Sequence, residues 1–394
     1  MKPFANRVNK LSVSQTVAID TKAKALLAAG KDIISLGAGE PSESTPDFIC
    51  DAAYRATKEG KTKYAAAAGI PELKEEICKK FKKDNVLRYH LDNITISSGA
   101  KHCIFNSLLA LINPGDEVII PSPYWVTYPE LVTFLGGVPI IIPGDVNTQF
   151  KISAKQLASV ITPRTKLFIL NSPCNPTGTV YSHDELSELS DVIVKNDIYC
   201  LSDEIYEKIL YDNHKHHCIA SLNDDIKKRS IVVNGVSKSY AMTGWRIGYT
   251  ACEISLAKVI GKIQSQSTLH PATPSQYAAL AALKSGNDFI GTMTEGLKRN
   301  RQTVIQYLEE IPSISFTEPA GAFYFFIDVS KFLKANNTGI SNSTDLCTYL
   351  LDDFLLATVP GSAFGHEGFI RISFTAPPAK LAEGLQRLKQ ALNP

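Results

Sequence analysis

Short apolar runs alternate along the chain with longer segments whose apolar positions recur every three or four residues. The runs are rich in Val and Ile and are bounded by Gly, Pro or Asn, a pattern that favours buried β-strands. They lie at 33–36, 94–97, 117–121, 138–142, 166–170, 198–201, 231–233 and 248–251. The segments between them, such as 71–81, 101–112 and 184–195, are typical of amphipathic helices. Strands that alternate with helices predict an α/β domain with a mostly parallel, buried sheet.

The pattern changes after about residue 286. A charged helical segment precedes an apolar run, a polar loop, a further helix and a short strand; the segments with clear bounds are 292–310, 322–328, 334–344 and 369–374. This order predicts a smaller α+β domain. We therefore expect an N-terminal arm over 1–48 that joins the small domain, a large domain over 49–285, and the small domain itself over 286–394.

Composition and charge narrow the class of protein. Hydrophobic residues make up 44% of the chain and charged residues 20%, as in globular proteins. The net charge of +2 is nearly neutral, so neither nucleic acid nor an anionic membrane is an expected partner. The first twenty residues contain no continuous apolar stretch, and the eight cysteines form no C-x-x-C pair. We expect a cytoplasmic protein with no membrane span.

One group of potential metal ligands stands apart from the rest. Asp212, His214, His216, His217 and Cys218 lie close together in a polar segment. The segment has no helical i,i+4 pair, and the chain has no second cluster at zinc spacing. We predict a solvated loop there and no metal.

Four unusual clusters follow predicted strands. In a doubly wound sheet, ligands bind beyond the carboxyl ends of the strands. The clusters are S-S-G-A-K at 97–101, N-S-P-C-N-P-T-G at 171–178, S-D-E-I-Y at 202–206 and S-K-S-Y-A-M-T-G-W-R at 237–246. In the first, small residues at a helix start let backbone N–H groups approach an anion. Many strand-to-helix turns need small residues, so this cluster alone does not establish a phosphate site.

The other three clusters together point to one kind of chemistry. Lys238 has an amine that can attack a carbonyl, and Arg246, on the same segment, can clamp a phosphate. Asp203 can pair with a cationic ring nitrogen, and Tyr206 can reach a phenolic oxygen. Asn175 supplies a further donor from a Pro-bounded loop. Taken singly, each residue is better interpreted as a turn cap or a solvated side chain, but the combination is the one that a pyridoxal 5'-phosphate site requires.

The N-P-T-G, S-D-E-I-Y and S-K-x-x-x-M-T-G-W-R segments resemble those of the class I aminotransferases, fold type I of the pyridoxal 5'-phosphate enzymes. The resemblance runs from G-A-G-E-P at 37–41 to the strand that carries Arg371. It is greatest to the bacterial subgroup of aspartate aminotransferases that includes prephenate-accepting enzymes. It implies a large α/β domain with a mostly parallel sheet, a smaller α+β domain, amino-acid and 2-oxo-acid substrates, and a homodimer with shared active sites.

The resemblance also implies a role for each residue of the cofactor site. Lys238 would form a Schiff base with the cofactor and move the proton between substrate and cofactor. Asp203 would keep the pyridine nitrogen protonated, while Tyr206 and Asn175 would bind the 3' oxygen. The remaining cofactor contacts are expected from Ser98, Gly99, Ala100, Lys101, Trp125, Ser237 and Arg246, and from Tyr64 of the neighbouring subunit.

The same resemblance implies a substrate site. Arg371 would bind the α-carboxylate through its planar fork, with Gly39, Trp125 and Asn175 against the substrate. Animal-type aspartate enzymes bind the distal carboxylate with an arginine from the partner subunit, and the matching segment here, 265–270, has no arginine.

The distal carboxylate therefore needs another partner. Lys101 and Thr16 match the lysine and threonine that bind it in the bacterial subgroup, which favours a dicarboxylic substrate. Ser12 stands where prephenate-accepting relatives tend to carry a basic or amide residue, so prephenate use stays open.

We therefore predict reversible ping-pong transamination, with aspartate and 2-oxoglutarate giving oxaloacetate and glutamate. Other reactions on the same scaffold stay open, because a fold does not determine a reaction: an aromatic or prephenate aminotransferase, a C–S lyase or an aminocyclopropane-type synthase. The non-enzymatic alternative is a regulatory domain that senses pyridoxal 5'-phosphate. A preceding helix-turn-helix domain would support it, whereas this chain begins with the expected substrate arm.

Overall fold

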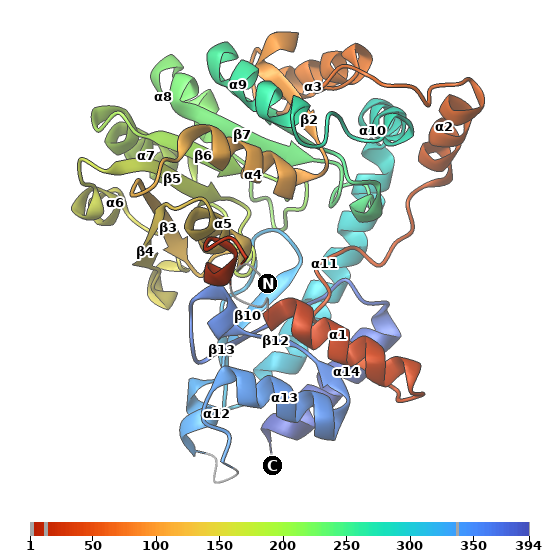
Figure 1. The fold of residues 1–394 in the computed structure, drawn as a ribbon. Helices are drawn as coiled ribbons and strands as arrows, with labels where there is room; N and C mark the ends of the chain where they lie inside the picture. Colours follow the sequence, from red (N-terminus) through yellow and green to blue (C-terminus); the bar gives the residue numbers. More distant parts are fainter. Residues whose placement is uncertain (1–3, 12–14, 336–338, 394) are drawn as a thin grey trace.

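The computed structural model describes residues 4–11, 15–335 and 339–393, and these residues form three β-sheets with helices around them (Figure 1). The largest sheet has seven strands in the order β2-β8-β7-β6-β5-β3-β4. Their bounds are β2 Ile94–Ser97, β3 Glu117–Ser122, β4 Val138–Pro143, β5 Thr165–Asn171, β6 Tyr199–Asp203, β7 Ser230–Gly235 and β8 Gly248–Ala251. Only β8 runs antiparallel to its neighbours β7 and β2 in this sheet. The predicted mostly parallel sheet is confirmed.

Helices cover both faces of this sheet, which explains why its strands are continuous apolar runs. Leu167 and Ile169 of β5 belong to one buried cluster, and their neighbours Phe168 and Leu170 belong to another. The first cluster is covered by α4 Ala100–Leu111, α5 Thr127–Phe134 and α9 Ile254–Ser265; the second by α6 Ala154–Val160, α7 His183–Lys195 and α8 Asp224–Arg229. A third cluster joins the β2 end of the sheet to α2 Asp47–Lys58, α3 Pro71–Asp84 and α10 Thr273–Ser285.

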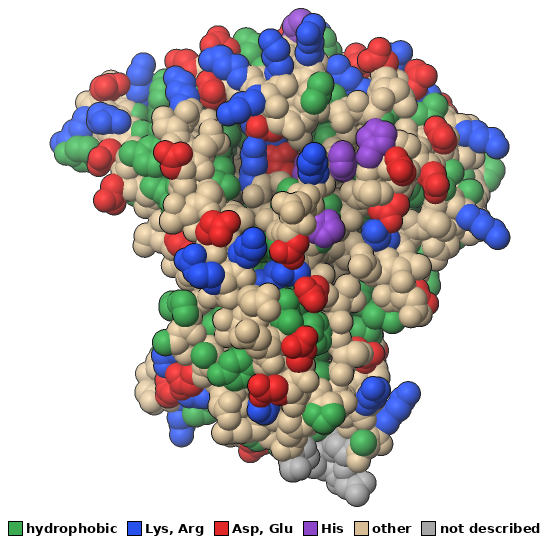
Figure 2. Space-filling model, turned by 180° about the vertical axis from the view of Figure 1, so that it is seen from behind, with side chains coloured by type: hydrophobic (Ala, Val, Ile, Leu, Met, Phe, Trp, Pro, Cys, Tyr) green, Lys and Arg blue, Asp and Glu red, His purple; other side chains and the backbone are tan. Residues whose placement is uncertain are grey.

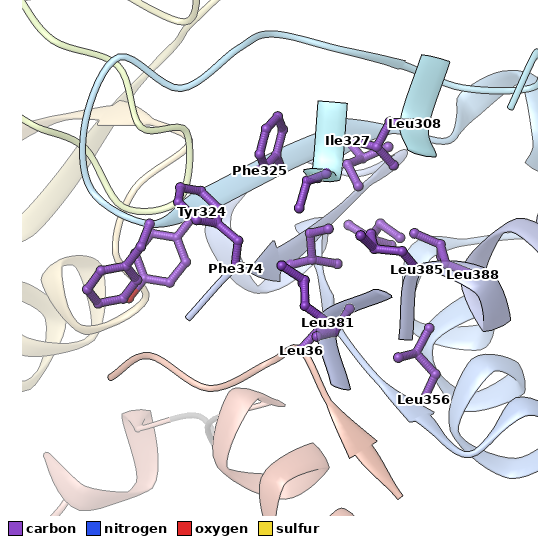
Figure 3. Close-up of a cluster of buried hydrophobic side chains, with 14 of the residues drawn as sticks. Leu36, Leu308, Tyr324, Phe325, Ile327, Leu356, Phe374, Leu381, Leu385 and Leu388 are labelled. Carbon is purple, nitrogen blue, oxygen red and sulfur yellow. The ribbon is translucent and has the colours of Figure 1, made fainter. Parts of the chain in front are cut away.

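A second sheet of four antiparallel strands has the order β12-β13-β10-β9. Its strands are β9 Ser315–Phe316, β10 Tyr324–Asp328, β12 Val359–Pro360 and β13 Phe369–Ser373. The helices α11 Asn287–Glu309, α12 Ser330–Ala335, α13 Ser343–Phe354 and α14 Pro378–Leu392 accompany it. Figure 3 shows part of its core, a buried cluster that includes Phe325 and Ile327 of β10 and Leu385 and Leu388 of α14. An α+β architecture is therefore present in the C-terminal part of the chain.

The polar segment predicted as a loop at 334–344 is shorter than expected. α12 extends to Ala335, and α13 begins at Ser343 after Asn342, whose side chain accepts a hydrogen bond from the Asp345 N–H. An N-cap asparagine starts a helix within a polar sequence, so polarity alone placed the loop boundary too late.

The N-terminal segment crosses to the C-terminal part of the chain. It contains α1 Gln15–Ala28 and β1 Ile34–Ser35, and β1 pairs in parallel with β11 Leu356–Ala357. Leu36 belongs to the same buried cluster as Leu381 (Figure 3). This packing supports the expectation that the arm joins the small domain; the boundaries at 48 and 285 stay predictions.

Six short 3₁₀ helices complete the elements of the described chain: η1 Val8–Lys10, η2 Leu91–Asn93, η3 Val146–Thr148, η4 Ile219–Ser221, η5 Thr243–Trp245 and η6 Gly361–Phe364. Within the described ranges, none of the helices has the length and apolar character needed to cross a membrane. Figure 2 shows Lys and Arg side chains interspersed with Asp and Glu over one face of the molecule.

Candidate active site

A cavity of about 630 Å³ lies where the carboxyl ends of β5 and β6 meet the arm and the four-stranded sheet. Most of the residues predicted from the sequence line it: Gly39, Ala100, Lys101, Trp125, Asn175, Asp203, Tyr206, Ser237, Lys238, Arg246 and Arg371. Chain segments far apart in sequence thus deliver two amines, a carboxylate, two guanidinium groups and an amide to one space.

Three predicted residues do not line this cavity, and a fourth cannot be placed. Ser98 donates its N–H to His102 Nδ1, and Gly99 lies behind the Arg246 guanidinium. Tyr64 is 89% exposed, with its ring edge-on to His270. The side chain of Thr16 lies outside the described residues, as does Ser12.

Lys238 follows β7, and its amine donates a hydrogen bond to the Gly39 carbonyl oxygen. The rings of Tyr206 and Phe323 each lie 6.0 Å from the Lys238 Nζ. Burial lowers the pKa of Lys238 to about 8, and the Glu40 carboxylate opposes that shift. An amine with a pKa near neutrality is partly unprotonated at working pH, so it can act as a nucleophile or a base.

Asp203 is the last residue of β6 and is only 3% exposed. Its Oδ2 accepts a hydrogen bond of 2.7 Å from Tyr128 Oη, and its Oδ1 accepts one of 3.3 Å from the Ile205 N–H. Burial raises the pKa of Asp203 to about 6, and the hydrogen bond from Tyr128 offsets part of that effect. A buried carboxylate in this state gains from a cationic partner, such as a protonated ring nitrogen.

Tyr206 and Asn175 connect the two larger sheets. Tyr206 Oη lies 2.8 Å from the hydroxyl of Tyr324, the first residue of β10. Asn175 Oδ1 accepts a hydrogen bond of 2.9 Å from Arg371 Nη1, and the Asn175 N–H donates to Asn171 Oδ1. The loop after β5 is therefore fixed at both its backbone and its side chain.

Arg371, in β13, has a buried guanidinium whose hydrogen bonds go to neutral oxygens. One is the Asn175 amide and the other is the Gly37 carbonyl, 2.8 Å from Nη2. The guanidinium carbon lies 4.4 Å from the Tyr324 ring centroid and 5.0 Å from that of Phe364. Among the described residues, the hydrogen-bond partners of Arg371 include no carboxylate, and its buried Nε has no hydrogen-bond partner. Such a group is suited to a ligand carboxylate.

A second group of residues at the site is suited to an anion with several oxygens. Gly99 precedes α4 with a φ of 84°, and a Cβ there would come within 2.3 Å of Arg246 Nη2. Arg246 is held by a hydrogen bond of 2.8 Å from Nη1 to the Thr243 carbonyl. Lys101 lies in the first turn of α4, with its Nζ 5.0 Å from the Trp125 ring centroid. A helix N-terminus beside a guanidinium and an ammonium fits a phosphate.

Sequence reasoning missed several residues of this site. Tyr128 and Tyr324 hold Asp203 and Tyr206, and the Thr243 hydroxyl donates to Glu40 Oε2 at 2.6 Å. Tyr128 lies one helical turn after Trp125, a spacing that could have identified it. Tyr324 lies in an apolar run, where nothing distinguishes its hydroxyl from a core position.

The prediction of a solvated loop at 212–218 is wrong for two of its residues. Cys218 is buried, and the His216 side chain is only 7% exposed. His216 Nε2 lies 2.9 Å from Glu204 Oε2, and ligand atoms of Glu204, Glu207 and His216 lie within 4.8 Å of one another. Both carboxylates already have protein partners, with Lys80 paired to Glu207.

Comparison with known proteins identifies the family of the chain. Residues 31–388 match the model of the family "Aminotransferase class I and II". A probable aspartate/prephenate aminotransferase of Aquifex aeolicus is 44% identical, with 99% of each chain covered, and an aspartate aminotransferase of Bacillus subtilis is 42% identical, with 98% of each covered. The crystal structure of an aspartate aminotransferase from Rhizobium meliloti superposes with a TM-score of 0.95 at 42% identity, covering 100% of this chain and 99% of that one.

The chain therefore belongs to the family of class I and II aminotransferases. Within that family, these three relatives, which match nearly the full length of the chain, are named as aspartate or aspartate/prephenate aminotransferases. The predicted fold and enzyme class are confirmed, whereas the roles of individual residues stay predictions.

Proposed function

We propose that this aminotransferase moves amino groups between aspartate and 2-oxoglutarate, with pyridoxal 5'-phosphate held at Lys238. The observation that carries the proposal is the set of groups that lines one cavity. The guanidinium of Arg371, whose hydrogen bonds within the described chain go to neutral oxygens, lines this cavity together with Lys238, Asp203 and Arg246, and Gly99 lies against Arg246. The full-length relatives named as aspartate aminotransferases support the choice of substrate.

The residues that line the cavity offer the charges and hydrogen-bond donors that pyridoxal 5'-phosphate needs. Arg246 and the start of α4 would hold the phosphate, and Asp203 would hold a proton at the ring nitrogen. Tyr206 and Asn175 would donate to the ring oxygen, and Trp125 would lie against the ring. Ser237 lines the same cavity beside Lys238. When bound, pyridoxal 5'-phosphate supplies an electron-withdrawing ring that stabilises negative charge at the substrate Cα.

The chain's own groups would orient the substrate and move its proton. Arg371 would fix the α-carboxylate, and Gly39 would lie next to the substrate from the arm. The lowered pKa of Lys238, about 8, lets its Nζ accept the Cα proton and return it. The Phe364 and Tyr324 rings flank the Arg371 guanidinium, which limits water there and strengthens its attraction for a carboxylate.

The proposal of an acidic substrate depends on Lys101 and on Thr16. Lys101 lines the cavity beside Trp125, so it can meet a second carboxylate on a ligand held by Arg371. An aspartate aminotransferase of Thermus thermophilus with maleate, a dicarboxylate, superposes on this chain with a TM-score of 0.94 at 37% identity. Prephenate is the second candidate substrate, favoured by the Aquifex aeolicus relative.

We also propose a homodimer in the cytoplasm. Tyr64 is exposed on its own chain, where it would be available to reach the phosphate of a neighbouring subunit. The eight cysteines are all free thiols, which suits a reducing compartment.

The test is the visible absorption spectrum of the purified protein with pyridoxal 5'-phosphate, before and after addition of L-aspartate. We expect a pH-dependent band that converts to the pyridoxamine form while oxaloacetate is released. Lys238→Ala should bind the cofactor without turnover. A band that converts only with another amino acid would move the substrate, and no band after added cofactor would overturn the proposal.

A further inference from the structure

Tyr128 is a buried phenol that contacts the functional carboxylate directly. It is the second residue of α5, just beyond the carboxyl end of β3, and it is 1% exposed. Its Oη donates a 2.7 Å hydrogen bond to Asp203 Oδ2, and its ring stands edge-on to Trp125 with centroids 5.4 Å apart. Both residues line the cavity.

Because of this hydrogen bond, the two carboxylate oxygens of Asp203 differ in their capacity to accept a further donor. Oδ2 accepts from Tyr128, whereas the one donor to Oδ1 among the described residues is the Ile205 N–H, at the long distance of 3.3 Å. A carboxylate oxygen can accept more than one hydrogen bond, so Oδ1 keeps capacity for another donor. The side chain is also held in one orientation, because Tyr128 approaches it from a different element than Ile205 does.

We propose that Tyr128 is a positioning residue that keeps Asp203 ionised and oriented, leaving Oδ1 for the cationic ring nitrogen of the cofactor. The assignment of that nitrogen rests on the proposed function, whereas the link between Tyr128 and Asp203 does not. A phenol donating to a carboxylate favours the ionised form, since the protonated form is the weaker acceptor.

Tyr128 keeps its own proton in this arrangement. Burial first, and then the neighbouring Asp203 charge, hold the pKa of Tyr128 well above its ordinary value of 10.0. The hydroxyl therefore acts as a donor and transfers no proton. Removing it would leave a desolvated carboxylate with one weak donor, and such a group takes up a proton more readily.

Other ionisable groups also face Asp203 and must be separated from the effect of Tyr128. They are Glu204, Lys238, Tyr206, Cys103 and Cys174. Of these, Lys238 is the cation that favours ionised Asp203, and Glu204 opposes it. None of them is changed by a substitution at Tyr128, so a titration of Asp203 in variants of residue 128 isolates the hydroxyl.

The first experiment is an infrared titration of the protonated-carboxyl band in the cofactor-free protein, with Asp203→Asn to assign the band. Tyr128→Phe should raise the midpoint of Asp203 by about one pH unit or more, as loss of a hydrogen bond to a charged group does. Tyr211→Phe is the matched control, because Tyr211 is another buried phenol that donates to a protein oxygen, the Ala322 carbonyl. An unchanged midpoint in Tyr128→Phe, or an equal shift in Tyr211→Phe, would overturn the proposal.

A second variant tests the opposite direction without removing any atom of the hydroxyl. Incorporation of 3-fluorotyrosine at position 128 makes the phenol a stronger donor, so the Asp203 midpoint should fall. This variant also covers the case in which Tyr128→Phe does not fold. A midpoint that rises or stays constant would contradict the proposal.

The holoenzyme adds a kinetic readout that a purely structural role would not move. Tyr128→Phe should lower kcat with little change in the KM for the amino acid, and the acid limb of its pH–rate profile should shift upward. A change in KM alone would count against the proposal. Failure of the cofactor proposal would appear separately, in the wild-type spectrum, and would leave the cofactor-free titration unaffected.

Discussion

Two buried regions lie on either side of the segment 203–207, and they differ in the partners of their carboxylates. Asp203 and Tyr206 line the cavity, whereas Glu204 and Glu207 enter a network with Lys80 and His216. All five residues of the segment are buried. On the cavity side the carboxylate has neutral hydrogen-bond donors, and on the network side each carboxylate has a polar or charged partner within the protein.

This difference appears in the pKa values of the two sides. Burial raises the pKa of Asp203 to about 6. Burial acts on Glu207 in the same direction, but the Lys80 and His216 charges outweigh it and lower the pKa of Glu207 to about 2. Burial alone therefore does not decide the state of a carboxyl; its partners do. Carboxylates whose partners all lie within the protein serve the fold, whereas a buried carboxylate that faces the cavity can take a partner from a ligand.

The largest expected effect is a loss of activity on the cavity side. Asp203→Asn should lower kcat by on the order of 10²–10⁴-fold, because the ring nitrogen loses its charged partner. The melting temperature should hardly change, since an asparagine oxygen can still accept from Tyr128. Half-reaction kinetics measure kcat, and calorimetry measures the melting temperature. A fall in stability without a fall in rate would show that the cavity side does not differ from the network side in this respect.

On the network side, stability should suffer instead. Glu207→Gln should cost about 3–5 kcal/mol of unfolding free energy, because Lys80 is left buried with an uncompensated charge. Denaturant titration measures the loss. The double variant Lys80→Met with Glu207→Leu should recover much of it, since replacing both partners by apolar groups removes the unpaired charge. A double variant less stable than the single one would show that the pair itself is needed.

The two regions should also respond to pH with opposite signs in the cofactor-free protein. The folded pKa of Asp203, about 6, lies above its ordinary value of 3.8, so the folded state binds more protons between these values and stability falls as pH rises. The folded pKa of Glu207, about 2, lies below 4.5, so its contribution is present above pH 4.5 and is lost as pH falls through 2. Unfolding free energies of the wild type minus those of Asp203→Asn and Glu207→Gln isolate each slope. Slopes of the same sign would refute the distinction.

The smallest effect concerns a carboxylate that is neither closed in a network nor buried. Glu40 is exposed at the cavity, where it accepts from Thr243 and raises the pKa of Lys238. Glu40→Gln should lower the pKa of Lys238 from about 8 by a fraction of a unit, so more neutral amine is present at pH 7. The pH dependence of cofactor capture by the cofactor-free protein measures this shift, with Glu40→Asp as the charge-preserving control. An upward shift would contradict the assignment.

Much of the fold follows from local pattern. The β-branched runs bounded by Gly, Pro or Asn became the strands of the large sheet, and the clusters after them lie at its carboxyl ends. The exception is 33–36, whose strand pairs with β11 and not with the large sheet. A two-residue strand contains no pattern that names its partner.

The site could be predicted only where a motif carried it. Lys238 and Asp203 stand in motifs, so their convergence was expected. His216 was misjudged because its polar neighbours suggested solvent, while its partner Glu204 directly follows the strand β6. Tyr324 was missed because its hydroxyl contacts Tyr206, 118 positions away in sequence. Contacts of this kind depend on tertiary packing, which a local sequence pattern does not contain.

The crossing of the N-terminal arm has a consequence for the order of folding during synthesis. Gly37 accepts a hydrogen bond from Arg371, 334 positions later, and β1 has no sheet partner until β11 has been made. At ordinary synthesis rates, roughly 20–60 seconds separate the two segments as they leave the ribosome. During that interval Leu36 lacks the C-terminal residues of its buried cluster. The large sheet can form early, whereas a complete substrate site forms only after nearly the whole chain has been released.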